Sequence, residues 1–156
     1  MQRQTQVKVK KPCIRLLRNE DMTQYMYLIN VFTPSECIKQ IERNDFEKWL
    51  ALSNCNNSYI YVMTRGKEII GTGKLLIEYK FNRGLTKAGH IEDIVIDPSC
   101  RGEGYGREMV KFLLNVAKER GCYKTSLSCN ERLLNFYKRC GEGLDVQFGY
   151  GVKYYL

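Results

Sequence analysis

The sequence lacks any apolar segment long enough to cross a membrane. No hydrophobic run approaches the ~20 residues that a spanning helix needs, although 44% of the 156 residues are hydrophobic. The first residues are polar and basic and contain no apolar core of a secretory signal. We therefore expect a cytoplasmic protein in which residues 1–12 form a mobile basic tail and residues 13–156 form one domain.

Histidine is nearly absent, and cysteine lacks the spacing of metal ligands. His90 is the only histidine, and the seven cysteines are scattered without a Cys-x-x-Cys pair. A zinc site would have to collect thiolates from distant positions. Reduced thiols, buried or half-buried, explain these cysteines more simply, so we expect no metal.

Acidic residues are fewer than basic ones: the chain has 17 aspartates and glutamates and 25 lysines and arginines, which give a net charge of +8. That excess suits an anionic partner: a nucleic acid, an acidic surface or a polyphosphate ligand. The lysines are dispersed, and no aromatic and basic recognition motif is present. We therefore expect neither nucleic acid nor membrane as a partner.

Internal repeats and low-complexity linkers are also missing, and hydrophobic periodicity predicts one alternating series of elements. Phe46, Trp49 and Leu50 fall on the apolar face of the second predicted helix. Strands outnumber crossover helices, which predicts a mixed sheet and argues against a dinucleotide fold. The predicted elements are a strand from residue 13 with a turn and cap at 19–21, helices at 22–31 and 35–50, strands at 59–65 and 68–81 joined by a turn at 66–67, a loop at 82–89, a strand at 90–96, a helix at 104–120, a strand at 123–129, a short helix at 131–140 and a strand at 146–156.

The stretch "GHIEDIVIDPSCRGEGYG", residues 89–106, combines two acids, an apolar run and a glycine-rich loop. The loop leads from a predicted strand into the first turn of a helix, where unpaired N–H groups favour an anion. Arg101 and Arg107 flank it and can pair with phosphate oxygens. Its glycine spacing fits neither nucleotide-binding fingerprint. A tight turn without a ligand remains an alternative.

"RGEGYG" after an apolar strand resembles the R/Q-x-x-G-x-G/A pyrophosphate loop of the GNAT acetyltransferases. Together with "GHIEDIVID", "GCYK" and "FYKRCG" in this order, it makes the chain similar to the eukaryotic glucosamine-6-phosphate N-acetyltransferase family from about residue 14 to its end. The resemblance implies an α/β (α+β) GNAT fold. Such a fold is a single domain with a mixed, mostly antiparallel central sheet flanked by helices, and with a C-terminal strand at a homodimer interface.

The resemblance also implies a reaction. Acetyl passes from the co-substrate acetyl-CoA to the amine of D-glucosamine 6-phosphate by direct attack in a ternary complex, without a metal. The products are CoA and N-acetyl-D-glucosamine 6-phosphate, which belongs to amino-sugar metabolism and UDP-N-acetylglucosamine biosynthesis. An acetyl-cysteine intermediate on Cys122 or Cys129 is disfavoured, because neither has a histidine nearby in the sequence.

By the same resemblance, the pantetheine arm pairs with the backbone of the apolar strand. The Ile94 N–H would polarise the thioester carbonyl, and the glycine loop would hold the pyrophosphate. The implied cofactor residues are Ile94, Val95, Ile96, Arg101, Gly102, Glu103, Gly104, Tyr105, Gly106, Arg107 and Asn130.

The implied catalytic residues are Tyr137, Glu92 and Asp93. Tyr137 would protonate the leaving thiolate, and Glu92 is the preferred route for deprotonating the amine. Neighbours on an extended strand point to opposite faces, so we expect the two acids not to form one dyad. The residues alone leave two other interpretations open: Tyr137 as a tyrosine of the core, and Glu92 and Asp93 as a pair of solvated acids.

The substrate residues implied by the resemblance carry hydroxyls, cations and acids for an amino-sugar phosphate. Tyr123 and Lys124 are expected to serve the partner's site, and Ser128 stands where the family pattern has an acid. The full set is Thr33, Lys80, Phe81, Asn82, Arg83, Glu92, Asp93, Tyr123 and Lys124.

Other functions remain open at this point. They are acetyl transfer to a protein, peptide or polyamine, nucleic-acid binding explained by the positive charge, and acyl-CoA binding without catalysis. The adjacent acids and "CYK" favour the sugar, and Tyr137 favours catalysis.

Overall fold

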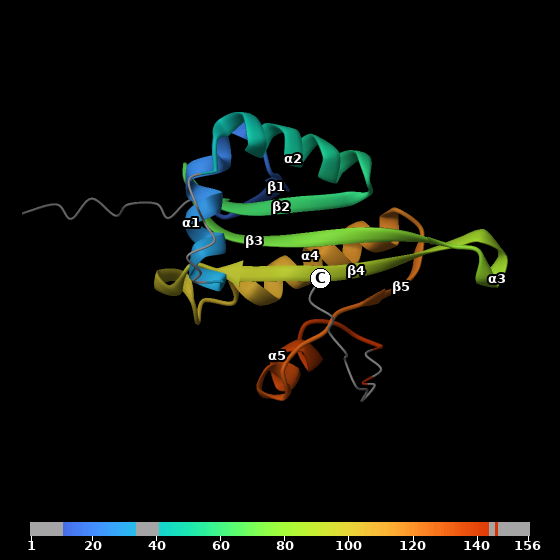
Figure 1. Cartoon of the computed structure of the whole chain (residues 1–156). Coiled ribbons are helices and arrows are strands. Elements are labelled where there is room, and N and C mark those ends of the chain that lie inside the picture. Colours follow the sequence, from blue (N-terminus) through green and yellow to red (C-terminus); the bar gives the residue numbers. More distant parts are fainter. Residues whose placement is uncertain (1–10, 34–40, 144–145, 147–156) are drawn as a thin grey trace, which may run out of the picture.

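A five-stranded sheet with helices on both faces forms the centre of the computed structural model, which describes residues 11–33, 41–143 and 146 (Figure 1). Neighbouring strands are antiparallel from β1 to β4, and β4 and β5 are parallel. The predicted mixed, mostly antiparallel sheet is therefore confirmed. In their order across the sheet, the strands are β1 (Cys13–Leu16), β2 (Ser58–Arg65), β3 (Glu68–Lys80), β4 (Thr86–Ile96) and β5 (Cys122–Ser126).

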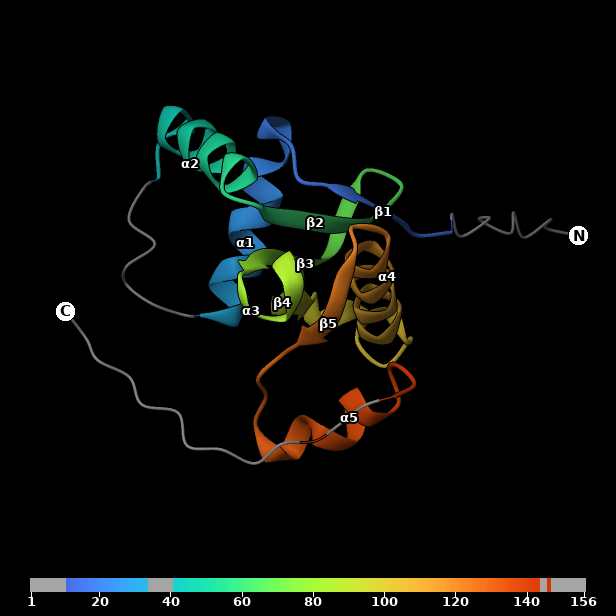
Figure 2. The same ribbon diagram turned by 90° about the vertical axis from the view of Figure 1, so that its right-hand side faces the viewer.

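The helices form two layers, one on each face of the sheet. Seen along the sheet, α1 and α2 cover one face and α4 covers the other, while α5 lies beyond β5 (Figure 2). The α-helices are α1 (Met22–Phe32), α2 (Arg43–Cys55), α3 (Asn82–Leu85), α4 (Tyr105–Glu119) and α5 (Leu134–Lys138), and single 3-10 turns occupy Asn19–Asp21, Pro98–Cys100 and Glu131–Leu133.

The layer of α1 and α2 packs through a small apolar cluster. Leu28 of α1 is fully buried, and Phe46 and Leu50 of α2 lie in the same cluster with Val62 of β2. Residues four apart share a helix face, so Phe46 and Leu50 both reach the sheet. Trp49, which we predicted on the same apolar face, is 71% exposed. That prediction is wrong because the buried stripe of α2 is narrower than its apolar content suggests.

The opposite layer depends on α4, whose buried residues recur every three or four positions as in an amphipathic helix. They cover the apolar side chains of β3 and β4. At Gly73 an added Cβ would lie 2.6 Å from Ile94 Cδ1 and 2.9 Å from Leu113 Cδ1. A side chain at this position would push the helix away from the sheet, so the glycine permits close packing. The buried residues of α4 are Met109, Val110, Leu113 and Ala117.

β4 begins earlier than the sequence predicts. Residues 82–89 were expected to form a loop, but α3 occupies Asn82–Leu85 and β4 starts at Thr86. From there β4 pairs with β3 on one side and, from Lys87, with β5 on the other. The glycines and polar residues of this segment favour a loop locally, and pairing on both sides outweighs that preference.

The boundaries of two other elements also differ from the prediction. The helix predicted at 35–50 begins at Arg43, after the extended Glu42, and continues to Cys55, where the side-chain amide of Asn56 donates to the Leu52 carbonyl at 2.9 Å. β5 ends at Ser126 instead of residue 129, because its last pair with β4 is His90 with Ser126. The hairpin at 66–67 and the helix predicted at 104–120 are confirmed.

Three predictions lie outside the described residues. They are the mobile tail over residues 1–10, the first part of helix 35–50, and the terminal strand over 147–156 that was assigned to the dimer interface.

A buried ion pair fixes the turn from β1 into α1. Arg15 donates through Nη1 and Nη2 to the Asp21 carboxylate at 2.6 and 2.9 Å, and the Arg18 backbone N–H donates to it at 2.9 Å. The Asp21 side chain is 7% exposed. The hydrogen bond from Arg15 outweighs burial and lowers the pKa of Asp21.

Candidate active site

β4 and β5 separate halfway along β4, and this opening defines the candidate site. The pairing of the two strands stops at His90 and Ser126, while β4 continues to Ile96. Among the described residues, no strand pairs with the β5 side of β4 beyond His90. An unpaired strand edge offers N–H and C=O groups to an extended ligand. The predicted cofactor residues Ile94, Val95 and Ile96 lie on this stretch.

A bulge in β4 shapes the same stretch. Thr72 pairs with Val95 and Lys74 pairs with Glu92, so one residue of β3 faces two of β4. Asp93 has a φ of 53°, in the left-handed region. Lys74 Nζ lies 2.7 Å from Glu92 Oε2 and 3.2 Å from Asp93 Oδ2. The expectation that the two acids point to opposite faces is therefore wrong, because the bulge interrupts the strand alternation.

Lys74 links the two carboxylates, and sequence reasoning missed it. Burial by itself would lower the pKa of Lys74, but the hydrogen bond to Glu92 and the charge of Asp93 outweigh burial and raise it. Burial, with a smaller contribution from Asp93, raises the pKa of Tyr25 on α1 to about 12. Two carboxylates facing one ammonium carry a net negative charge, which a second cation such as an amine substrate can neutralise.

A pocket of about 300 Å³ lies beside the bulge. Ligand pockets typically measure about 300–1,000 Å³, so this one suits a small metabolite. Its wall combines residues of β4 with the chain that follows β5 and the end of α1. The lining residues are Phe32, His90, Ile91, Glu92, Asp93, Ser126, Leu127 and Ser128.

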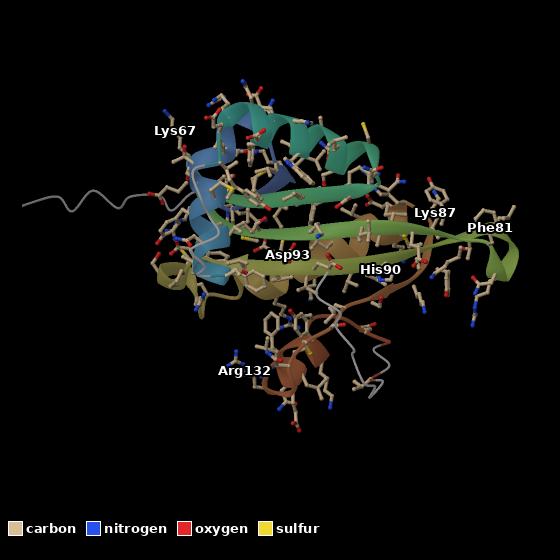
Figure 3. All side chains as sticks on the ribbon, viewed as in Figure 1. Lys67, Phe81, Lys87, His90, Asp93 and Arg132 are labelled. Atoms are coloured by element: carbon tan, nitrogen blue, oxygen red, sulfur yellow. The ribbon has the colours of Figure 1, made fainter. Side chains whose placement is uncertain are left out.

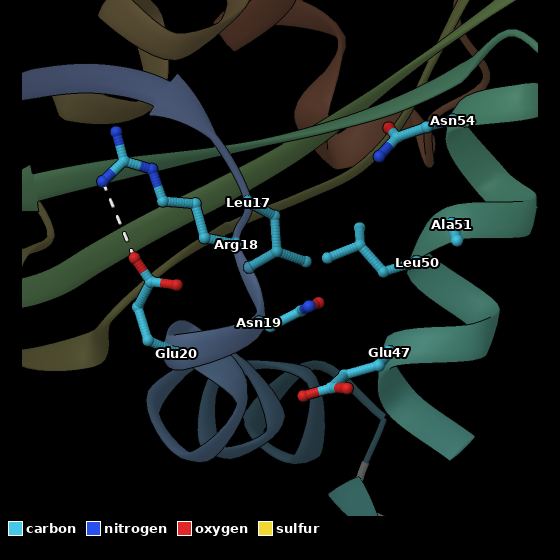
Figure 4. A pocket seen from close by; sticks show the side chains of 8 residues that line it. All are labelled: Leu17, Arg18, Asn19, Glu20, Glu47, Leu50, Ala51 and Asn54. Carbon is cyan, nitrogen blue, oxygen red and sulfur yellow. Dashed lines mark ion pairs between the residues drawn. The ribbon is translucent and has the colours of Figure 1, made fainter. Parts of the chain in front are cut away.

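A second pocket, of about 380 Å³, is larger but is lined by other residues (Figure 4). It lies between the turn after β1 and α2, and none of the predicted site residues lines it. We therefore assign the site to the smaller pocket, which holds both predicted acids. The second pocket is lined by Leu17, Arg18, Asn19, Glu20, Glu47, Leu50, Ala51 and Asn54.

The glycine loop leads from the end of β4 into α4. Gly104 is the N-cap of α4, with a φ of 88°, and no side chain caps the helix. Gly102 also has a positive φ, of 85°, and both positions are open to solvent. No side chain therefore occupies the first N–H groups of α4, an arrangement that can bind an anion.

The side chains around the loop differ in their contacts. Arg101 folds back and donates through Nε to the Ile96 carbonyl at 3.1 Å, while Arg107 is exposed on the first turn of α4. A hydrogen bond with Glu103 raises the pKa of Tyr105. An added Cβ at Gly106 would lie 3.2 Å from Phe136 Cζ, so the loop approaches α5 closely.

Tyr137 belongs to α5, which lies across the opening from β4 (Figure 1). Its ring packs edge-on against Phe136 with the centroids 4.9 Å apart. Burial raises the pKa of Tyr137, and Cys129 and Cys140 raise it further. A phenol that keeps its proton at neutral pH can act as a donor. Asn130 is exposed at the start of the same segment, and its backbone carbonyl accepts from the Leu133 N–H at 2.9 Å.

The predicted sugar residues fall into two separate groups. Thr33 directly follows Phe32, which lines the pocket. Glu92 and Asp93 line the same pocket. The other six gather around the hairpin tip, residues 79–85, which projects beyond the sheet with Phe81 far from Asp93 (Figure 3). Arg83 Cζ lies 5.4 Å and Lys124 Nζ 5.6 Å from the centroid of the Tyr123 ring. One chain therefore does not bring both groups together. The tip group comprises Lys80, Phe81, Asn82, Arg83, Tyr123 and Lys124.

His90 is a further polar residue of the pocket that sequence reasoning considered only as a metal ligand. Its Nδ1 lies 3.0 Å from Ser126 Oγ and its Nε2 2.9 Å from Glu78 Oε2. The signal available in the sequence was its position in β4, two residues before the acid pair.

Within residues 11–33, 41–143 and 146, no three His, Cys, Asp or Glu side chains are grouped so that they could hold a metal ion. None of the helices described in these ranges is long and apolar enough to cross a membrane.

Comparison with known proteins assigns a family to this arrangement. The acetyltransferase (GNAT) family matches residues 18–141. A glucosamine 6-phosphate N-acetyltransferase of Trypanosoma brucei brucei is 30% identical over 128 residues, which cover 82% of this chain and 86% of that protein. A probable glucosamine 6-phosphate N-acetyltransferase 2 of Oryza sativa subsp. japonica is 48% identical over 73 residues, or 47% of this chain, and the match spans 44% of that relative's length.

A solved structure supports the same assignment. The crystal structure of glucosamine-6-phosphate N-acetyltransferase from Arabidopsis thaliana superposes with a TM-score of 0.82 at 30% identity, covering 94% of this chain and 99% of that one. The chain belongs to the acetyltransferase (GNAT) family and is an acetyl-CoA-dependent N-acetyltransferase.

Proposed function

We propose that this acetyltransferase transfers the acetyl group of acetyl-CoA to the amine of D-glucosamine 6-phosphate. The observation that carries the proposal is the β4 bulge, which holds Glu92 and Asp93 against Lys74 at the start of a free strand edge. The two acids, which can bind an amine, therefore lie next to the strand edge that can bind a thioester. The names of the relatives in Trypanosoma and Arabidopsis support the same acceptor. We place the reaction in the cytoplasm.

Acetyl-CoA would extend along the opening between β4 and β5. Its pantetheine amides would pair with the backbone of Ile94, Val95 and Ile96 as an added strand does. Its pyrophosphate would reach the first turn of α4, where Gly102 and Gly104 leave backbone N–H groups accessible. Asn130, at the other wall of the opening, would contact the pantetheine.

The reacting groups would meet near the bulge. The Ile94 N–H would donate to the thioester oxygen as charge develops there. Tyr137, whose raised pKa keeps the phenol protonated, would donate its proton to the departing sulfur.

Glu92 and Asp93 would attract the substrate ammonium and orient it. They face Lys74 within 3.2 Å, so the pair carries more negative than positive charge before the substrate arrives. Thr33, beside Phe32 at the pocket wall, would supply a hydroxyl to the sugar.

The phosphate of the sugar requires cations that the pocket itself does not offer. The hairpin tip and β5 carry Arg83 and Lys124, which both lie near the Tyr123 ring, and β3 ends in Lys80, whose Nζ pairs with Glu78. None of the three lines the pocket. A homodimer in which the tip group of one chain completes the partner's pocket would place these cations at the phosphate. We therefore propose a homodimer with shared sites.

A thiol-release assay with acetyl-CoA and a panel of amines tests the acceptor. We expect turnover with D-glucosamine 6-phosphate, an acetylated product identified by mass spectrometry, and much slower turnover with glucosamine that lacks the phosphate. Turnover with a peptide or polyamine and none with the sugar phosphate would overturn the assignment of the acceptor while leaving acetyl transfer intact.

A further inference from the structure

A row of three side chains crosses the sheet beside the pocket without a role in the transfer proposed above. Ser126 Oγ on β5 lies 3.0 Å from His90 Nδ1 on β4, and His90 Nε2 lies 2.9 Å from Glu78 Oε2 on β3. Ser126 and His90 line the same pocket as Asp93. Figure 3 shows His90 and Asp93 close together along β4. The row therefore connects the place expected for the amine with a carboxylate outside the pocket.

Strand register holds the row in place. His90 and Ser126 are direct partners in the parallel pair of β4 and β5. Glu78 is the partner of Ala88, two residues before His90 on β4. Diagonal neighbours of this kind lie within reach of long side chains. The three groups thus meet because of backbone pairing and do not depend on a mobile loop.

The hydrogen-bond partners determine where the protons lie. Hydrogen bonds from Lys80 and then from His90 lower the pKa of Glu78, so its carboxylate is ionised at neutral pH and only accepts. The hydrogen of a neutral imidazole must therefore be on Nε2. His90 Nδ1 is then the acceptor and the Ser126 hydroxyl the donor. This arrangement leaves the lone pairs of Ser126 Oγ available to a donor in the pocket.

We propose that Ser126, His90 and Glu78 form a proton relay that deprotonates the acceptor ammonium, an assignment that rests on the proposed function. One N–H bond of the ammonium breaks and its proton passes to Ser126 Oγ. The original hydroxyl proton of Ser126 passes to Nδ1 of His90. The resulting imidazolium is stabilised by the Glu78 carboxylate at Nε2.

The remaining protons balance the reaction. The freed lone pair of the amine forms the N–C bond, the C–S bond breaks, and the sulfur takes the proton of Tyr137. The second amine proton restores Tyr137 through solvent. The His90 side chain is 33% exposed, so the imidazolium returns its proton to water, and one proton is released for each acetyl group transferred.

The acids of the bulge are less suited to this step. Glu92 and Asp93 are already paired with Lys74 at 2.7 and 3.2 Å, so a permanent cation competes for their oxygens. We assign them the orientation of the ammonium and assign its deprotonation to His90, in place of the earlier expectation for Glu92.

Glu78 is the charged group in direct contact with His90 among the described residues, and further charges lie nearby on β3 and β4. β5 offers the uncharged Ser126, and α1 offers the apolar ring of Phe32 at the pocket wall. The charged neighbours are Glu78 and Lys80 on β3, and Glu92 and Asp93 on β4 with Lys74 of β3 between them.

Nitrogen-15 NMR tests the relay without any substrate. His90 is the only histidine, so one imidazole signal pair reports it directly. We expect the Nε2–H tautomer in the neutral ring, and loss of this preference in Glu78→Gln. A neutral ring that carries its hydrogen on Nδ1 would overturn the relay, because Ser126 would then have to accept instead of donate.

Kinetics with His90→Gln tests the proton transfer. We expect kcat near neutral pH to fall about 100-fold, since a positioned general base contributes roughly 10²–10⁴-fold, while the KM for acetyl-CoA stays within about twofold, because no step of cofactor binding uses the imidazole. The deficit should shrink as the pH rises, because the amine then loses its proton to solvent, and added imidazole should restore part of the rate. Equal deficits at every pH would indicate a structural role and overturn the relay.

Matched variants separate the possible outcomes. Ser126→Ala, at an exposed position, should show the same pH-dependent loss, and it decides the question if His90→Gln does not fold. Glu68→Gln, on the same strand as Glu78 but at its other end, should behave as the wild type. An acetylated Ser126 found by mass spectrometry would overturn the relay in favour of a nucleophile. If D-glucosamine 6-phosphate is not an acceptor, the same comparison uses the best amine of the panel, so the relay and the acceptor fail separately.

Discussion

At the scale of single residues, Tyr137 shows how burial prepares a group for chemistry. Its raised pKa results mainly from burial on α5, because burial disfavours the charged phenolate. The residue type alone does not distinguish this donor from a tyrosine of the core. The position of α5 across the opening from β4 favours the donor (Figure 1).

We expect Tyr137→Phe to lower kcat about 100-fold, because the leaving thiolate loses its proton donor, and to leave the affinity for acetyl-CoA nearly unchanged. Steady-state kinetics and calorimetric titration with CoA separate the two effects. Tyr27→Phe, at a side chain that is 58% exposed on α1, is the control. Unchanged turnover in Tyr137→Phe would exclude the role of general acid.

Asp21→Asn should cost about 2 kcal/mol of unfolding free energy at pH 7, because it weakens the hydrogen bonds with Arg15. The pKa of Asp21 in the folded state lies below its ordinary value of 3.8. Its contribution is therefore complete above that value and is lost as the pH falls through the lower, folded-state pKa.

Urea unfolding at several pH values measures this dependence. Wild type and Asp21→Asn should converge in acid, and Glu20→Gln should differ little from the wild type at any pH, because the Glu20 side chain is 68% exposed. A difference between wild type and Asp21→Asn that stays constant into acid would contradict the assignment.

At the scale of elements, the β4 bulge decides the geometry of the site, and the sequence does not reveal it. Alternation predicts opposite faces for Glu92 and Asp93, but the extra residue turns both toward Lys74. A bulge depends on the register between β3 and β4, which the pairing of the two strands sets. Patterns within one strand carry no information about it.

At the bulge, glycine and alanine substitutions should affect stability in opposite orders at the two neighbouring acids. We expect Asp93→Gly to be more stable than Asp93→Ala by about 1 kcal/mol, because a Cβ is disfavoured at positive φ and glycine adopts it freely. At the neighbouring Glu92 the order should reverse, because glycine weakens an ordinary strand position. Urea unfolding of the four variants checks this, and the same order at both positions would argue against the bulge.

Other elements could be predicted to different degrees. The glycine loop and α4 follow from local signals, namely the positive-φ glycines and an apolar stripe at helical spacing. The start of β4 at Thr86 and the end of β5 at Ser126 do not, because strand neighbours determine both. The relay of Ser126, His90 and Glu78 is missed for the same reason, since it joins three strands.

At the scale of the whole molecule, the hairpin tip stands out as an apolar and basic projection without cover among the described residues. Phe81 is 87% exposed, Leu85 77% and Tyr79 59%. The resemblance to known enzymes predicted sugar residues here, and the structure separates them from the pocket of the same chain. A second chain is the simplest way to unite the two groups.

Phe81→Ser should weaken the proposed dimer without unfolding the chain, because an exposed ring contributes little to the core of one chain. Sedimentation equilibrium measures the association, and the KM for D-glucosamine 6-phosphate should rise together with the monomer fraction. Trp49→Ser, at a side chain that is 71% exposed on α2, is the control. A monomeric wild type would overturn the shared site.

The opening between β4 and β5 has a consequence for the lifetime of the protein. Without a ligand, the edge beyond His90 is a template on which a strand of another molecule can add. A cofactor that fills the edge competes with self-association, and at 100 times its dissociation constant it would add about 2.7 kcal/mol to stability. We expect CoA to suppress light scattering of the warmed protein, so that the supply of cofactor would govern how long the enzyme persists as well as how fast it works.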